Sequence, residues 1–161
     1  MSVSDGADAI HLVVAVALTY ALGFERDLRG ASAGDRVFAL IGAGTALLGI
    51  IAVHGTSTAL AGAITGVGFI GGGLVFRQAQ GRAEVVRGLT TAAAIFAAAG
   101  IGAAAGEGRL LVATVATALA LFTLEIRHVR ALSVLDGHRW AGRFRNDDAP
   151  AHSTPDAPPP D

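Results

Sequence analysis

The sequence predicts an all-α integral membrane protein with five transmembrane helices, its N-terminus outside and its C-terminus in the cytoplasm. No Asp, Glu, Lys or Arg interrupts the 40 residues from 37 to 76. A spanning helix needs about 20 apolar residues to cross a hydrocarbon core of about 30 Å, so this stretch fits two spans joined by a tight turn. Further apolar runs lie on both sides of it, and the arginines fall almost wholly into alternate loops.

Five apolar runs fill residues 1–128, which we expect to form one membrane domain. The expected spans are 9–24, 37–53, 58–76, 89–106 and 110–126. Residues 129–161 are expected to form a cytoplasmic tail. This tail should be disordered from about residue 146, because a sequence rich in Pro, Asp and Ala offers no apolar face to bury.

The arginines predict the orientation. The chain has 12 basic residues, and 11 of them lie in the loops 25–36 and 77–87 or after Ile126. Only Arg109 lies on the other side. Short arginine-rich loops stay in the cytoplasm, which places the C-terminus there. A sixth span or a missing one would mix the two sets of loops, so the pattern also favours five.

The third span contains five glycines between Gly66 and Gly73. Each interior glycine costs about 0.5–1 kcal/mol against alanine, so these glycines call for a reason. The favoured interpretation is close helix packing along small residues, a spacing that recurs at 42, 46 and 49 and at 102 and 106. The alternative is a helix broken around 66–73, as in transporters. Residues 66–71 also match G-x-G-x-x-G, but dinucleotide binding is not expected within a spanning segment that lacks the required acidic residue.

The fourth span begins after Arg87 and Gly88. Thr90 or Thr91 is predicted to cap this helix by accepting hydrogen bonds from its first N–H groups. A functional alternative is that the helix N-terminus holds an anion or an acidic side chain. With the third-span glycines, these residues form the expected packing or functional corner: Gly62, Gly66, Gly68, Gly71, Gly72, Gly73, Arg87, Gly88, Thr90, Thr91, Glu25 and Arg26.

The predicted topology brings the charged residues that follow the first span to the same face. Their carboxylates are expected to pair with neighbouring arginines. Alternatives are a surface that binds a partner and a weak divalent-cation site, for which Glu25 and Asp27 are the candidate oxygen ligands.

Catalytic motifs are absent from the sequence. It has no cysteine and neither H-E-x-x-H nor G-x-S-x-G. We therefore expect no enzyme activity and no cofactor. The basic segment 127–145, with Trp140, is expected to contact anionic lipid rather than nucleic acid, since it follows a spanning helix.

Three blocks of the sequence, in order, resemble the MgtC/SapB family of bacterial inner-membrane proteins. They are residues 23–27 after the first span, 66–73 in the third and 86–93 at the start of the fourth. Residues 33–36 look like a looser version of the family's Gly-Leu-Arg-Thr segment. The likeness runs from about residue 9 to 128.

The chain departs from the family in two respects. Thr58 and Gly62 stand where the family often has Arg and Gln. Many members carry a soluble cytoplasmic domain after the last span, whereas 35 residues follow Ile126 here. Roles that depend on such a domain are therefore not expected.

The resemblance implies a multi-pass protein of the bacterial inner (plasma) membrane linked to magnesium homeostasis. Well-known members are regulators that bind other membrane proteins, including the ATP synthase, rather than magnesium pumps. We therefore expect a regulator, with the lipid bilayer, a second copy of the chain and other membrane proteins as partners. The alternative is an ion or small-solute transporter that uses the acidic cluster and the Gly66–Gly73 segment.

Overall fold

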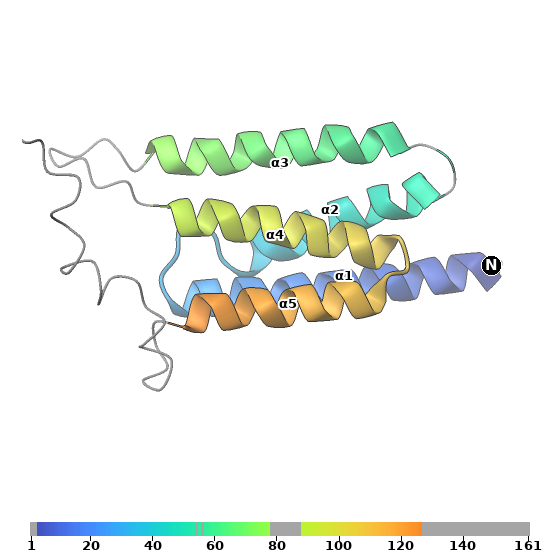
Figure 1. The fold of residues 1–161 in the computed structure, drawn as a ribbon, viewed down its shortest axis with the longest axis horizontal. Helices are drawn as coiled ribbons and strands as arrows, with labels where there is room; N and C mark the ends of the chain where they lie inside the picture. Colours follow the sequence, from blue (N-terminus) through green and yellow to red (C-terminus); the bar gives the residue numbers. More distant parts are fainter. Residues whose placement is uncertain (1–2, 54, 56, 78–87, 127–161) are drawn as a thin grey trace, which may run out of the picture. The chain divides into compact units, whose positions relative to one another are not determined.

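The computed structural model describes residues 3–53, 55, 57–77 and 88–126. All regular structure in these ranges is helical, as the sequence predicts. The five helices are α1 (Val3–Leu28), α2 (Asp35–Val53), α3 (Ser57–Arg77), α4 (Leu89–Gly106) and α5 (Leu110–Glu125) (Figure 1). Arg87 and the tail 129–161 lie outside the described residues.

Four of these helices are long and apolar enough to cross a membrane: α1, α2, α3 and α4. α5 has 16 residues, which at 1.5 Å each extend about 24 Å, less than the hydrocarbon core of about 30 Å. The all-α, five-helix prediction is therefore confirmed for the described residues, and four of the helices meet the length expected of a span.

α1 is longer than the predicted span 9–24, because the charged residues that follow the apolar run continue the helix. Glu, Arg and Leu are good helix formers, and Arg26 in the last turn interacts favourably with the helix dipole. The connection to α2 is correspondingly short, and Gly30 within it adopts a left-handed conformation (φ 65°). Glu25, Arg26 and Asp27 thus lie on a helix and not in a loop.

Successive helices run in opposite directions (Figure 1). The end of α1, the start of α2 and the start of α4 therefore lie at the same end of the helical bundle. We call this the α1–α4 end. It brings Arg26 and residues 29–32 close to Gly88 and Thr91, which are more than 50 positions further along the chain.

The core lies where α1, α2 and α4 meet, and small residues permit the close approach. A methyl group added at Gly42 would collide with Thr19 of α1, and one at Gly106 would collide with the backbone of Ala46. One at Gly102 would lie 2.9 Å from the Cα of Gly42. The small residues at 42, 46, 102 and 106 therefore pack α2 against α4, as their spacing predicts.

The glycines of α3 pack differently from those of α2 and α4. The helix is continuous from Ser57 to Arg77, so the interpretation as a helix broken around Gly66–Gly73 is wrong. Gly71 alone approaches another helix, where an added methyl group would lie 3.4 Å from the Cβ of Ala92. At the other five predicted packing positions in α3 an added methyl group would meet no described atom within 4 Å; these are Gly62, Gly66, Gly68, Gly72 and Gly73.

Candidate functional site

Glu25 is a buried carboxylate at the α1–α4 end, with 8% of its surface exposed. The Nε of Arg29, one helical turn further on, donates a hydrogen bond to its Oε1 at 3.3 Å. The Nη1 of Arg26 lies 3.8 Å from its Oε2. Glu25 is therefore paired with arginines, as the sequence analysis expected for the carboxylates at this face.

Arg26 connects α1 to α4. Its Nη2 donates a hydrogen bond of 3.4 Å to the hydroxyl of Thr91, which is itself buried. Two buried atoms of this cluster, Glu25 Oε2 and Arg26 Nε, have no hydrogen-bond partner among the described residues. The contact joins two of the three sequence blocks that resemble the MgtC/SapB family, although 65 positions separate its partners.

The N-terminus of α4 has no side-chain cap, so the prediction that Thr90 or Thr91 caps it is wrong. Gly88 occupies the N-cap position in a left-handed conformation, with φ 94°, and the first helical hydrogen bond runs from Ala92 N to Gly88 O at 2.8 Å. The hydroxyl of Thr91 instead accepts from Arg26, and Thr90 is exposed.

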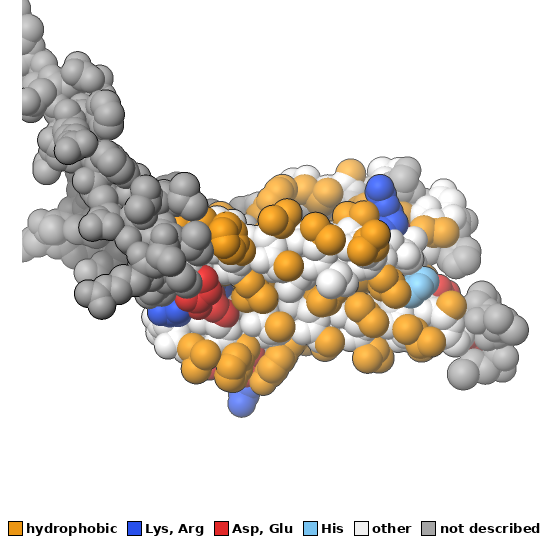
Figure 2. Space-filling model, turned by 60° about the horizontal axis from the view of Figure 1, so that its bottom comes forward, with side chains coloured by type: hydrophobic (Ala, Val, Ile, Leu, Met, Phe, Trp, Pro, Cys, Tyr) orange, Lys and Arg blue, Asp and Glu red, His pale blue; other side chains and the backbone are white. Residues whose placement is uncertain are grey.

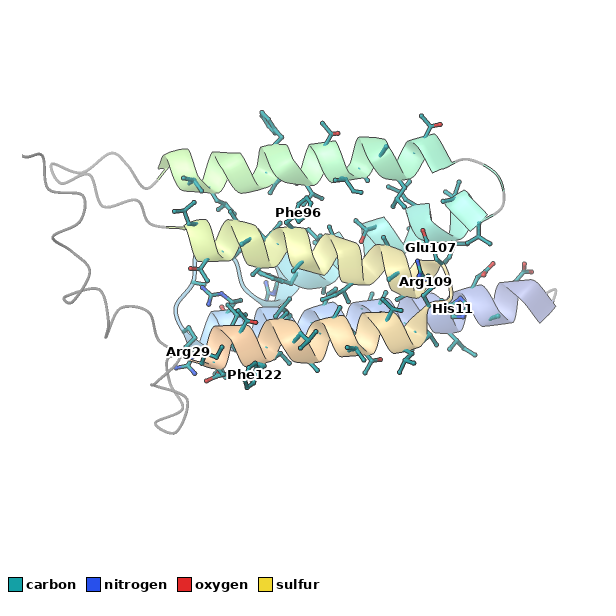
Figure 3. The ribbon with its side chains drawn as sticks, viewed as in Figure 1. His11, Arg29, Phe96, Glu107, Arg109 and Phe122 are labelled. Carbon is teal, nitrogen blue, oxygen red and sulfur yellow. The ribbon has the colours of Figure 1, made fainter. Side chains whose placement is uncertain are left out.

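A polar cavity of about 470 Å³ lies between the end of α1 and the start of α4. We call it the α1–α4 pocket. Arg26, Arg29 and residues 30–32 line it from one side, and Gly88 and Thr91 line it from the other. Figure 3 shows Arg29 at this end of the bundle. The sequence signal for this pocket was the pair of arginines three positions apart after the first span.

Asp27 lies apart from Glu25. It lines a second pocket of about 370 Å³ with Asp35 and Arg36, and its carboxylate packs against Gly34. Residues i and i+2 of a helix point in different directions, so the predicted Glu25–Asp27 cation site is not formed as a pair. Groups of three or more His, Asp or Glu side chains that could hold a metal are absent from the described ranges.

The surroundings of Gly66 are apolar. A groove of about 410 Å³ between α2 and α3 is lined by Leu40, Ile41, Gly44, Gly66 and Ile70, among others. A transport path along α3 would need a polar cavity at this level, and this groove does not provide one. In the space-filling view, hydrophobic side chains cover the middle of the face and charged ones gather toward its ends (Figure 2).

At the opposite end of the bundle, α4 turns into α5. Gly108 makes this turn in a left-handed conformation, with φ 79°, and the ring of His11 packs against it (Figure 3). Arg109 lies 3.9 Å from Glu107. These contacts hold the turn together.

The sequence pattern of the MgtC family matches residues 12–131. The chain is 36% identical over 132 residues to an Escherichia coli protein named "Putative magnesium transporter YhiD", an alignment that covers 74% of this chain and 60% of YhiD. It is 33% identical to SrpB of Synechococcus elongatus, over 72% of each chain. It is also 36% identical to MgtC of Salmonella typhimurium, over 70% of this chain and 48% of MgtC.

The chain thus spans 60% of YhiD and 48% of MgtC. No solved structure matches it. The family match covers all five helices except the first turns of α1. It includes Glu25, Arg26 and Thr91. The chain therefore belongs to the MgtC family.

Proposed function

We propose that this protein is a non-enzymatic regulator in the bacterial inner membrane, linked to magnesium homeostasis, which acts through contacts between its helices and other membrane proteins. The link to magnesium is supported by family membership and by the name that YhiD carries. The arginine distribution supports an orientation with the C-terminus in the cytoplasm.

The observation that carries the proposal is the unpacked glycine face of α3. Gly62, Gly66 and Gly73 lie within about 40° of one another around the helix at 100° per residue. All three are exposed, and Phe69, which is 84% exposed, lies on the same side of the helix. Helices associate in lipid where small residues allow their backbones to approach. This face is therefore suited to a helix of a second copy or of another membrane protein.

The experiment compares two substitutions on opposite faces of α3. Gly66→Leu fills the proposed contact face, whereas Gly68→Leu adds the same side chain about 200° around the helix. Each variant replaces the native protein at native expression level. We expect Gly66→Leu to abolish crosslinking to partner proteins and to impair growth in low magnesium, while Gly68→Leu retains both. Unchanged crosslinking and growth with Gly66→Leu would refute the proposed face.

A magnesium transporter is the second candidate function. The observation that favours it is the pair of carboxylates, Asp27 and Asp35, in one pocket at the α1–α4 end. The test is Mg²⁺ flux into proteoliposomes that contain the purified chain. The regulator proposal would be displaced if the chain moved Mg²⁺ and either Asp27→Asn or Glu25→Gln abolished that flux. Arg109→Gln, at the other end of the bundle, is the control and should leave the flux intact.

A further inference from the structure

The start of α2 lies at the edge of the hydrocarbon region. The long uncharged run of the chain begins at Val37, so Asp35 and Arg36 are the last charged residues before it. These three residues, with Asp27 and Gly34, line the pocket of about 370 Å³ described above, which we call the α2 pocket. Because an uncharged run of spanning length lies in the hydrocarbon core, this pocket is at the depth where lipid headgroups join their acyl chains.

The α2 pocket carries charges of both signs. Asp27 is exposed and its carboxylate lies against Gly34, so a ligand in the pocket can reach it. Asp35 accepts hydrogen bonds from the Tyr20 hydroxyl and from its neighbour's backbone N–H, and a carboxylate has about four acceptor positions. Arg36 is exposed and offers a planar donor fork. The pocket therefore suits a group that carries a positive and a negative charge close together.

An apolar groove continues from this pocket along α2. Val37 lines the pocket, whereas Leu40 and Ile41, three and four residues further on, line the groove between α2 and α3. Residues at these spacings are neighbours on one face of a helix. The charged pocket and the apolar groove thus follow one another along the same side of α2.

The groove has the length of one leaflet of a bilayer. From Leu40 to Leu48 it extends about 12 Å along α2, and half of a hydrocarbon core is about 15 Å deep. Its lining includes Gly44 and Gly66, both exposed, where an added methyl group would meet no described atom within 4 Å. The lack of side chains at these two positions leaves room for a chain of methylene groups.

We infer that the α2 pocket and the adjoining groove bind one molecule of phosphatidylethanolamine. One acyl chain lies in the groove, the ammonium donates hydrogen bonds to Asp27 and Asp35, and the phosphate accepts them from Arg36. The quaternary ammonium of phosphatidylcholine has no N–H to donate. Phosphatidylglycerol has no cation at all, and the two carboxylates repel its negative charge.

This lipid site goes beyond the contacts proposed for α3. Its charged residues belong to α1 and α2, and its ligand is a lipid and not a protein. Gly66 borders both surfaces, so the tests below use residues that belong to the lipid site alone. Their failure would leave the proposed partner face of α3 standing, and the loss of that face would leave the lipid site standing.

The first test measures selection of the headgroup. The full chain, delipidated in mild detergent, is offered equal amounts of phosphatidylethanolamine, phosphatidylcholine and phosphatidylglycerol with identical acyl chains, and native mass spectrometry counts the lipids retained. We expect the wild type to retain one phosphatidylethanolamine selectively. Asp27→Asn should lower the ratio of bound phosphatidylethanolamine to bound phosphatidylcholine about fivefold.

Glu107→Gln is the matched control for the headgroup. It removes the same charge at the opposite end of the bundle, so the ratio should stay at its wild-type value. Equal retention of phosphatidylethanolamine and phosphatidylcholine by the wild type would overturn the inference, as would a preference for phosphatidylglycerol. Equal changes in Asp27→Asn and Glu107→Gln would overturn it too, because the selection would then not arise in the α2 pocket.

The second test fills the groove. Gly44→Leu places a side chain where the acyl chain should lie, whereas Gly100→Leu adds the same side chain to open space on α4. We expect Gly44→Leu to lose the retained phosphatidylethanolamine and Gly100→Leu to keep it. If both variants keep it, the groove holds no acyl chain and the inference is wrong. If Gly44→Leu dissociates a dimer and leaves the lipid count unchanged, the groove takes a helix of a second copy, and the inference is again wrong.

Discussion

α3 and α4 have nearly the same character in sequence, yet their surroundings differ. Both are apolar helices of similar length and equal hydropathy, rich in glycine and alanine. Of the spanning segment of α4, 56% is buried, against 11% of that of α3. Among the described helices, α4 contacts α1, α2 and α3, whereas α3 contacts α2 and α4. The position of a helix within the bundle, and not its composition, thus decides which glycines are packed.

The largest expected effect is that of Gly102→Leu in α4. A Cβ at this position would lie 2.6 Å from the carbonyl oxygen of Gly42, and backbone cannot move aside as a side chain can. Overpacking of this kind costs about 3 kcal/mol, which would show as a large loss of thermal stability in detergent. Gly100→Leu, two positions earlier with open space around it, is the control. Similar melting temperatures for both variants would contradict the α2–α4 packing.

A smaller loss is expected from Thr91→Val, which keeps the shape of the side chain and removes the acceptor for Arg26. Hydrogen bonds to charged groups contribute about 1.5–3 kcal/mol. Because this one is long, at 3.4 Å, we expect about 1.5 kcal/mol of destabilisation. The free energy of unfolding is compared with that of Thr90→Val, whose side chain is exposed. Equal values for the two variants would show that the bond between α1 and α4 adds nothing.

Gly88→Ala tests the start of α4. Its φ of 94° is a conformation that residues with a Cβ rarely adopt, so we expect a loss of about 1–2 kcal/mol, measured by thermal unfolding. Gly100→Ala lies in the same helix with open space around it, and it should lose nothing. A Gly88→Ala protein as stable as the wild type would mean that this turn adopts another conformation.

The smallest effect on stability is expected from Gly66→Ala in α3. An added methyl group there would meet no described atom within 4 Å, so the free energy of unfolding should change by no more than about 0.5 kcal/mol. Crosslinking in native membranes should nevertheless weaken, because the same methyl group would lie between α3 and its proposed partner. If Gly66→Ala markedly lowered the stability of the chain in dilute detergent, Gly66 would have to be packed within the folded chain. The contrast between the open glycines of α3 and the packed glycines of α4 would then be lost.

The candidate site was partly predictable. The pairing of Glu25 with nearby arginines follows from its i,i+4 relation to Arg29 on a helix. The bond between Arg26 and Thr91 does not follow, since 65 positions separate the two residues. The position of Asp27 does not follow from the sequence either. Asp27 lines a pocket with Asp35 and not with Glu25, because the short connection to α2 folds back past Gly34.

The sequence by itself determined the class of the protein and its family. The length of an uncharged apolar run and the order of the three blocks that resemble the family are properties of the linear chain. The physical limit set by the bilayer acts on each run separately. The tertiary structure alone decided which glycines are packed, which pocket each charged side chain lines and that α4 starts without a side-chain cap. These features depend on which helices become neighbours, and helix packing is a relation between segments that no single segment encodes.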